Sequence, residues 1–177
     1  MDFASKNDIT ENEYFEMIKN KTAVLIGCSF MFGGIVAEAN DLNTNLLYEI
    51  GLNLGIAFQL EDDLLDCFGD QEKFGKKIGG DIIEKKKTLL YLFTKSKLES
   101  EKKLEFENVF NSNEIAESEK INSIKLFYET SGALKYVKNK VKVYFDKADQ
   151  LINKLELDND TKRKLNQFSK TLLNREI

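Results

Sequence analysis

The 177 residues contain no proline, and this absence constrains the fold more than any other feature of the sequence. Proline interrupts helix interiors because it lacks a backbone N–H and its ring clashes with the preceding turn. Apolar residues also recur at spacings of three and four from Ala133 to Leu157, which is typical of an amphipathic helix. The sequence therefore predicts an all-α fold, a bundle of helices.

The organisation along the chain follows from the same patterns. We expect helices over residues 10–38, 44–68, 81–96, 101–110, 116–131, 133–157 and 161–175. Thr10 and Glu13 have the spacing of a capping box at the first of them. Four glycines and three lysines between residues 69 and 80 indicate a loop. A chain of this length supports one ordinary hydrophobic core, so we expect a single helical domain over 1–177.

Composition removes several classes of function. Without histidine, the chain cannot build Ser-His-Asp or Cys-His catalytic sites or the usual histidine-based zinc sites. Its two cysteines, Cys28 and Cys67, form no Cys-x-x-Cys motif, which favours a reduced, cytoplasmic location. A net charge of −4 argues against nucleic-acid binding. The longest uncharged run, residues 22–37, is shorter than the roughly 20 residues of a membrane span, so we expect a soluble protein.

The segment from Phe58 to Asp66 carries the clearest chemical signal. On a helix, Gln59, Asp62, Asp63 and Asp66 stand at i, i+3, i+4 and i+7 and share one face. Carboxylates so close repel one another by about 0.2–0.5 kcal/mol per i,i+4 pair, so local stability does not explain them. A Mg²⁺ ion held by one or two carboxylates and a substrate phosphate does. The alternative is a solvated acidic face.

A glycine- and lysine-rich segment follows, with the sequence Gly75-Lys76-Lys77-Ile78-Gly79-Gly80-Asp81 and then Lys85-Lys86-Lys87-Thr88. Glycines let backbone N–H groups approach a phosphate, and lysines add point charges. No Ser or Thr follows Lys76-Lys77 and a helix precedes the segment, so it is not a nucleotide P-loop. A flexible connection is the alternative. Lys21, the last charge before the apolar run, has a similar alternative as a lysine that snorkels from a core helix.

In this order, Lys21-Thr22-Ala23, Phe58 to Asp66 and Gly75 to Thr88 resemble the trans-isoprenyl diphosphate synthases, the polyprenyl synthetase family. The resemblance extends through the chain and is strongest over residues 14–93. It implies the C-terminal helices of the isoprenoid-synthase fold. It also implies a prenyltransferase that joins an allylic diphosphate head-to-tail with isopentenyl diphosphate, using Mg²⁺.

The resemblance also implies roles for individual residues. Asp62 would bind Mg²⁺ directly, with Asp63 and Asp66 acting mainly through water or neighbouring groups. Three lysines would grip the allylic diphosphate: Lys21, Lys86 and either Lys76 or Lys77. Thr22 and Gln59 would stabilise the allylic carbocation, and Phe58 would border the prenyl pocket.

Two departures from the family pattern set the expected limits. The family has an earlier aspartate-rich motif, whereas Asp62-Asp63 is the only Asp-Asp pair here. The family also holds isopentenyl diphosphate with arginines and a histidine of its first half, whereas the only arginines here are Arg163 and Arg175. The chain thus resembles a C-terminal half, which we expect to be inactive alone and to form a homo-oligomer or dock with a missing N-terminal half.

Two other functions stay open at this level. One is a non-catalytic truncated or partner subunit that docks through the stripe from Ala133 to Leu157. The other is a fragment of a class I terpene cyclase, which shares the fold. The pair Phe58-Gln59 and the glycine–lysine segment favour the prenyltransferase over the cyclase.

Overall fold

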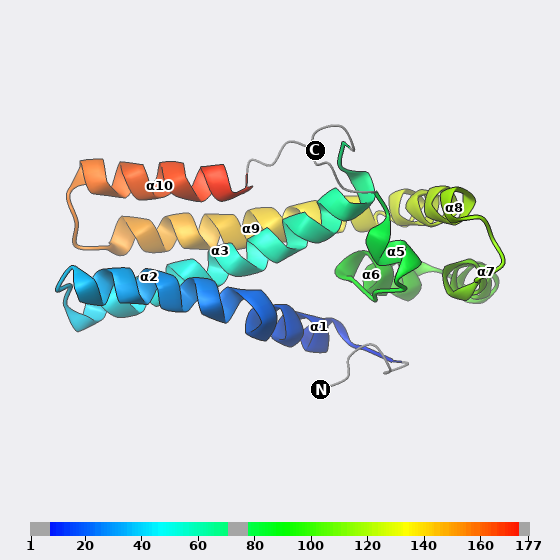
Figure 1. Cartoon of the computed structure of the whole chain (residues 1–177), viewed down its shortest axis with the longest axis horizontal. Helices are drawn as coiled ribbons and strands as arrows, with labels where there is room; N and C mark the ends of the chain where they lie inside the picture. The colour runs from blue at the N-terminus through cyan, green and yellow to red at the C-terminus, as the bar shows by residue number, and fades with distance from the viewer. Residues whose placement is uncertain (1–7, 71–77, 174–177) are drawn as a thin grey trace. The chain divides into compact units, whose positions relative to one another are not determined.

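The computed structural model describes residues 8–70 and 78–173, and all of its regular secondary structure in those ranges is helical (Figure 1). The elements are α1 (Glu11–Ile18), the π-helix η1 (Lys19–Ala23), α2 (Val24–Val36), α3 (Asp41–Phe68), α5 (Gly80–Ile83), α6 (Leu89–Lys97), α7 (Ser100–Asn111), α8 (Glu117–Thr130), α9 (Ala133–Lys154) and α10 (Asn159–Leu173). The predicted all-α fold is confirmed. Among the described helices, none combines the length and apolar character needed to cross a bilayer.

The chain divides into two compact units, which are described separately. Within the described ranges, unit 1 comprises residues 8–14, 62–70 and 78–138, and unit 2 comprises residues 15–61 and 139–173. The long helices α3 and α9 each contribute residues to both units. The single domain expected from the sequence stays a prediction.

Unit 2 is built around apolar contacts between long helices. A fully buried cluster is formed by Ile50 and Leu54 of α3, Ala148 and Ile152 of α9, and Leu155 directly after α9. Phe30 of α2 and Leu165 of α10 pack against this cluster. Figure 1 shows these helices as the long ribbons of the molecule. Ala148 and Leu155, two members of the amphipathic stripe from Ala133 to Leu157, are thus part of this core.

Unit 1 is built from shorter helices around aromatic side chains. Phe106 and Phe110, one turn apart on α7, are both buried. The Tyr91 ring of α6 lies 5.3 Å from the Phe106 ring and 4.4 Å from the Phe110 ring, measured between centroids. Tyr128 of α8 completes the group at 6.2 Å from Phe106. Tilted and edge-to-face contacts of this kind add to the energy of area burial.

Local hydrogen bonds decide where the first helices begin and end. The capping box is confirmed, because the Thr10 N–H donates to Glu13 at 2.9 Å and the Glu13 N–H donates to Thr10 Oγ1 at 3.2 Å. The helix expected to begin at residue 44 begins instead at Asp41. The reason is that the Asn40 side chain accepts the Asn43 N–H at 2.8 Å, which makes Asn40 the N-cap.

The helix predicted over 81–96 is wrong, because the chain forms α5, breaks after Glu84 and forms α6. Lys85 adopts the left-handed backbone region with φ of 55°, and Thr88 is extended. The Lys85 ammonium donates to the Asn111 carbonyl and to Asn113 Oδ1, both at 2.7 Å. These tertiary contacts at the end of α7 compensate the strain of the left-handed residue.

Candidate functional site

Helix α3 runs without interruption through the residues that the sequence singled out. We call Asp62, Asp63 and Asp66, all in unit 1, the aspartate stripe. Their exposure differs: Asp62 is exposed, Asp66 is half-buried and Asp63 is buried. Gln59, one turn earlier in unit 2, is buried as well. The stripe is therefore not a uniformly solvated acidic face.

The buried member of the stripe is paired with a tyrosine of α1. Tyr14 Oη donates a hydrogen bond to Asp63 Oδ2 at 2.6 Å, and both side chains are buried. Burial, reinforced by the Asp63 charge, raises the pKa of Tyr14, so the phenol keeps its proton. A buried carboxylate is costly unless it is hydrogen-bonded. The Tyr14 phenol donates a short hydrogen bond to the Asp63 carboxylate, and hydrogen bonds to ionised groups are stronger than those between neutral groups.

The last member of the stripe fixes the start of α5. Asp66 Oδ2 accepts the backbone N–H of Asp81 at 2.8 Å, and the Asp66 carbonyl accepts the N–H of Gly79 at 2.6 Å. Burial raises the pKa of Asp66, partly offset by the Asp81 hydrogen bond. Residues 79–81 are thus attached to the end of α3 from both the side chain and the backbone of Asp66.

Lys86 contacts the residue that is attached in this way, Asp81. Its ammonium donates to Asp81 Oδ1 at 2.6 Å and forms an ion pair with Glu84 Oε2 at 2.8 Å. Burial lowers the pKa of Lys86, but the bonds to Asp81 and Glu84 outweigh burial and raise it, so the side chain is cationic. Asp81 therefore links the stripe to the lysine that the family resemblance assigns to diphosphate. The predictions for Lys76 and Lys77 fall outside the described residues.

In unit 2, Lys21 and Thr22 lie within the π-helix η1. A π-helical turn holds more residues than an α-helical turn and is frequent at functional sites. Thr22 Oγ1 donates to Gln59 Oε1 at 2.9 Å, which joins two of the predicted residues directly. Lys21 is exposed and Phe58 is half-buried.

A close crossing of helix backbones positions this pair. A Cβ atom placed on Gly55 of α3 would lie 2.5 Å from the Ala23 Cα, and one placed on Gly51 would lie 2.7 Å from the Gly27 Cα. Real Cβ atoms do not approach backbone atoms so closely, so only glycine fits at these two positions. The Thr22–Gln59 hydrogen bond joins η1 and α3 next to this close contact.

The donor set is suited to Mg²⁺ shared with a phosphate rather than to a metal held by protein alone. Within residues 8–70 and 78–173, no three Asp, Glu or Cys side chains converge closely enough to hold an ion. Mg²⁺ commonly takes only one or two carboxylates, keeps several waters and completes its shell with substrate phosphate. The exposed Asp62, beside the anchored Asp63, fits that chemistry.

Three features of this region are not in the sequence prediction. Tyr14 lies on the apolar side of the first helix, where a tyrosine hydroxyl needs a partner, and this is the signal that could have found it. Asp81 closes the glycine–lysine segment, but its link to Asp66 depends on a contact across 15 residues. The π-helix leaves no mark in the spacing of apolar residues.

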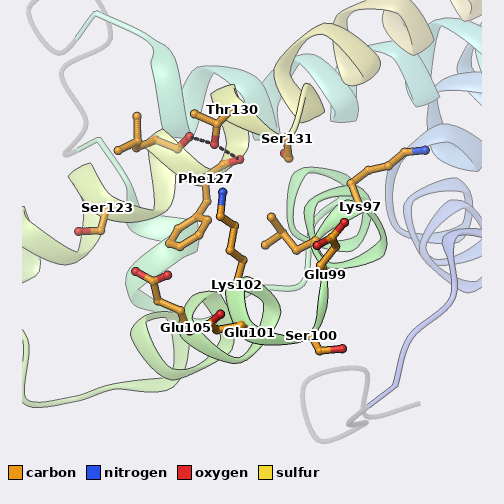
Figure 2. A pocket seen from close by; sticks show the side chains of 12 residues that line it. Lys97, Glu99, Ser100, Glu101, Lys102, Glu105, Ser123, Phe127, Thr130 and Ser131 are labelled. Carbon is orange, nitrogen blue, oxygen red and sulfur yellow. Dashed lines mark hydrogen bonds between the residues drawn. The ribbon is translucent and has the colours of Figure 1, made fainter.

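A surface hollow of about 1150 Å³ in unit 1 lies apart from all of these residues. Lys102 and Glu105 of α7 and Phe127 and Thr130 of α8 are among its lining residues (Figure 2). Figure 2 also shows the Thr130 hydroxyl satisfied by backbone carbonyls of its own helix. The lining mixes both signs of charge and contains none of the predicted site residues, so the hollow is not part of the candidate site.

The family model of the polyprenyl synthetases matches residues 1–127. The chain belongs to the polyprenyl synthetase family. A member of this family, the geranylgeranyl diphosphate synthase of Saccharolobus solfataricus, is 37% identical over 164 residues, which cover 93% of this chain and 49% of that protein.

Solved structures agree with this assignment to the polyprenyl synthetases. A crystal structure of a geranylgeranyl pyrophosphate synthase matches with a TM-score of 0.91 and 40% identity, over 99% of this chain and 55% of that one. The geranylgeranyl pyrophosphate synthetase of Pyrococcus horikoshii matches with a TM-score of 0.88 and 30% identity, over 99% of this chain and 52% of that one. The chain spans about half the length of the curated relatives that it matches.

Proposed function

We propose that this chain supplies the second aspartate-rich motif and the diphosphate-binding lysines of a trans-prenyltransferase. The reaction is the head-to-tail joining of an allylic diphosphate to isopentenyl diphosphate. One observation carries the proposal. In this chain, a member of the polyprenyl synthetase family, the exposed Asp62 lies on a stripe whose other two carboxylates accept hydrogen bonds from Tyr14 and from the Asp81 N–H. Solvation alone would not require those hydrogen bonds.

The residues of unit 1 would act on the diphosphate. Asp62 would be the direct ligand of Mg²⁺, and Asp63 and Asp66 would act through water or through their hydrogen bonds. When bound, Mg²⁺ supplies electrostatic stabilisation of the leaving diphosphate. Lys86, with Lys76 or Lys77, would contribute further positive charge to the same oxygens. Lys86 would exchange its contacts with Asp81 and Glu84 for contacts with phosphate.

The residues of unit 2 would act on the hydrocarbon part of the substrate. The Thr22–Gln59 pair presents oxygen dipoles that would stabilise positive charge on the allylic group. Lys21 would add a contact to diphosphate, and Phe58 would border the prenyl chain. None of these groups needs to transfer a proton, which agrees with the absence of histidine.

Half of the machinery is not represented in these 177 residues, because Asp62-Asp63 is their only Asp-Asp pair. We therefore expect no condensation from this chain alone with Mg²⁺ and both substrates. Turnover would require, in addition to these residues, the other aspartate-rich motif and the isopentenyl diphosphate site.

Thermal melting with Mg²⁺ and inorganic diphosphate tests the proposal without requiring turnover. A ligand at ten times its dissociation constant stabilises the folded state by about 1.4 kcal/mol, which raises the melting midpoint by a few degrees. Asp62→Asn should abolish this increase. Without ligand, the same change should stabilise the chain by about 0.5–1 kcal/mol, because it removes a charge that repels its neighbours near a helix C-terminus.

Glu49→Gln is the matched control, because it removes one exposed carboxylate from the same helix away from the stripe. It should leave the ligand-induced shift intact. If the parent chain shows no shift at millimolar Mg²⁺ and diphosphate, the proposed metal–diphosphate site is wrong, although the family membership stands.

A further inference from the structure

A tyrosine outside every motif of the sequence reaches the aspartate stripe. Tyr14 and Asp63 are 49 residues apart, yet their side chains form a 2.6 Å hydrogen bond and are only 1% and 6% exposed. Asp63 is the immediate neighbour of Asp62 on α3. Tyr14 therefore connects α1 to the aspartate stripe.

The bond restricts Asp63 before any ligand binds. Oδ2 is occupied by the phenol, so the carboxyl plane has a fixed orientation. Asp66, three residues further along the same helix, is restricted in a similar way by the Asp81 N–H. Carboxylates near metals usually have such partners, which orient them and lower the cost of binding. Two of the three carboxylates in the stripe are thus held by groups from α1 and α5.

The chemistry of the donor is as informative as its position. A lysine or arginine at this place would hold Asp63 equally well, but it would cancel the charge. The phenol of Tyr14 donates a proton in a hydrogen bond and stays neutral. The negative charge of the stripe, and hence its attraction for a divalent cation, is preserved while the carboxylate is immobilised.

We propose that Tyr14 is a positioning residue for Mg²⁺-diphosphate binding, which orients the Asp63 carboxylate beside Asp62 without neutralising it. This inference rests on the proposed function of the stripe and adds to it a residue that lies outside the aspartate-rich and lysine-containing motifs. Tyr14 would act through Asp63 and not through a contact of its own with the ligand.

Tyr14→Phe removes one oxygen atom and keeps the ring that fills the buried site. Calorimetric titration of the chain with Mg²⁺ and inorganic diphosphate should show an affinity about 10-fold lower for Y14F, the size of effect typical of residues that orient a ligating group. In an Asp63→Asn background, the same change should alter the affinity less than about 2-fold. Such non-additivity identifies residues that act through one another.

Tyr136→Phe is the matched control. Tyr136 also donates its hydroxyl to a carboxylate within unit 1, that of Glu11, at 2.8 Å and 2.9 Å to its two oxygens. Y136F loses the same kind of bond away from the stripe. It should therefore leave the affinity for Mg²⁺ and diphosphate unchanged, even if its melting midpoint falls as much as that of Y14F.

Three results would overturn the role of Tyr14. The first is an unaltered affinity in Y14F, the second is an equal loss in Y14F and Y136F, and the third is a Y14F chain that does not fold under conditions where Y136F folds. Each would assign Tyr14 a purely structural role while the parent chain still binds the ligand. Absence of binding by the parent chain would overturn the proposed function itself, and this role with it.

Discussion

Individual lysines in this chain have roles that their neighbours in sequence do not share. Lys85 donates to carbonyl and amide oxygens at the end of α7, whereas Lys86 faces Asp81. Lys120 is only 3% exposed, and its ammonium donates to the Ser112 carbonyl at 2.9 Å. Lys85 and Lys120 thus satisfy carbonyls that a helix C-terminus leaves without partners. Of the Lys85-Lys86 pair, Lys86 is the one whose ammonium contacts Asp81, the residue bonded to the aspartate stripe.

The pH dependence of stability should report the burial of Lys120. Burial, and secondarily the charge of Lys85, lower the pKa of Lys120. Between that lowered value and the unfolded value of about 10.4, the unfolded chain binds more protons, so this lysine makes stability rise with pH. Relative to Lys120→Met, the free energy of unfolding of the parent chain should increase from neutral pH towards pH ~10.4. Urea unfolding at a series of pH values measures the difference.

Lys142→Met provides the comparison, because the Lys142 side chain is exposed and pairs with Asp146 one turn away. Its stability profile should run parallel to that of the parent chain. Parallel profiles for the Lys120 variant as well would show that the burial of that ammonium has no thermodynamic consequence.

Helix geometry explains what could be predicted about single residues. The spacing of Gln59, Asp62, Asp63 and Asp66 was enough to place them along one face, because α3 is continuous there. Their different exposure could not be predicted. It depends on Tyr14 and Asp81, which lie in other elements, and no local pattern reports such partners. The roles of Lys76 and Lys77 stay predictions.

At the scale of elements, the close contact of α3 with η1 and α2 depends on glycines, which carry no side chain. Gly55→Ala would place a methyl group 2.5 Å from the Ala23 Cα, which is a backbone atom and not the end of a flexible side chain. Overpacking of this kind should destabilise the chain by about 1–3 kcal/mol. Chemical unfolding measures the change in the free energy of unfolding.

Gly33→Ala is the opposite case on α2, because an added Cβ there meets nothing within 4 Å. Alanine should stabilise that helix by up to about 1 kcal/mol through its higher helix propensity. A Gly55 variant as stable as the Gly33 variant would contradict the close crossing, and with it the positioning of Thr22 against Gln59.

A helix boundary set by contacts between residues close in sequence was predicted, and one set by contacts between distant residues was not. The capping box at Thr10 is encoded within four residues and was found from sequence. The break at residues 84–88 was missed because a run of lysines has good helix propensity. The ammonium of the left-handed Lys85 is held by Asn111 and Asn113, more than 25 residues away.

At the scale of the whole molecule, α2 presents apolar side chains to solvent. Leu25, Phe32 and Val36 are 71%, 59% and 84% exposed, and their spacing of seven and four residues places them on one face. Contiguous apolar surface favours association. We therefore expect sedimentation velocity to detect dimers or larger species that increase with concentration.

Replacing Phe32 and Val36 together by lysine should shift the distribution toward the monomer. Leu126→Lys, at a residue of α8 that is similarly exposed, should not. A compact monomer of the parent chain at high concentration would contradict this prediction.

The π-helix between α1 and α2 has a consequence for insertions and deletions. Each residue of an α-helix rotates the chain by roughly 100° about the axis. The π turn of η1 holds one residue more than an α-helical turn, so it changes the rotation of α1 relative to α2. Deleting Asn20 would let regular α-helical bonding replace the π turn and would rotate α1 by about that angle. Tyr14 and Ile18, both 1% exposed, would then turn away from the side on which they are buried. The length of this segment therefore sets the rotation of α1 about its axis. A substitution in η1 changes one side chain, whereas a deletion rotates every side chain of α1.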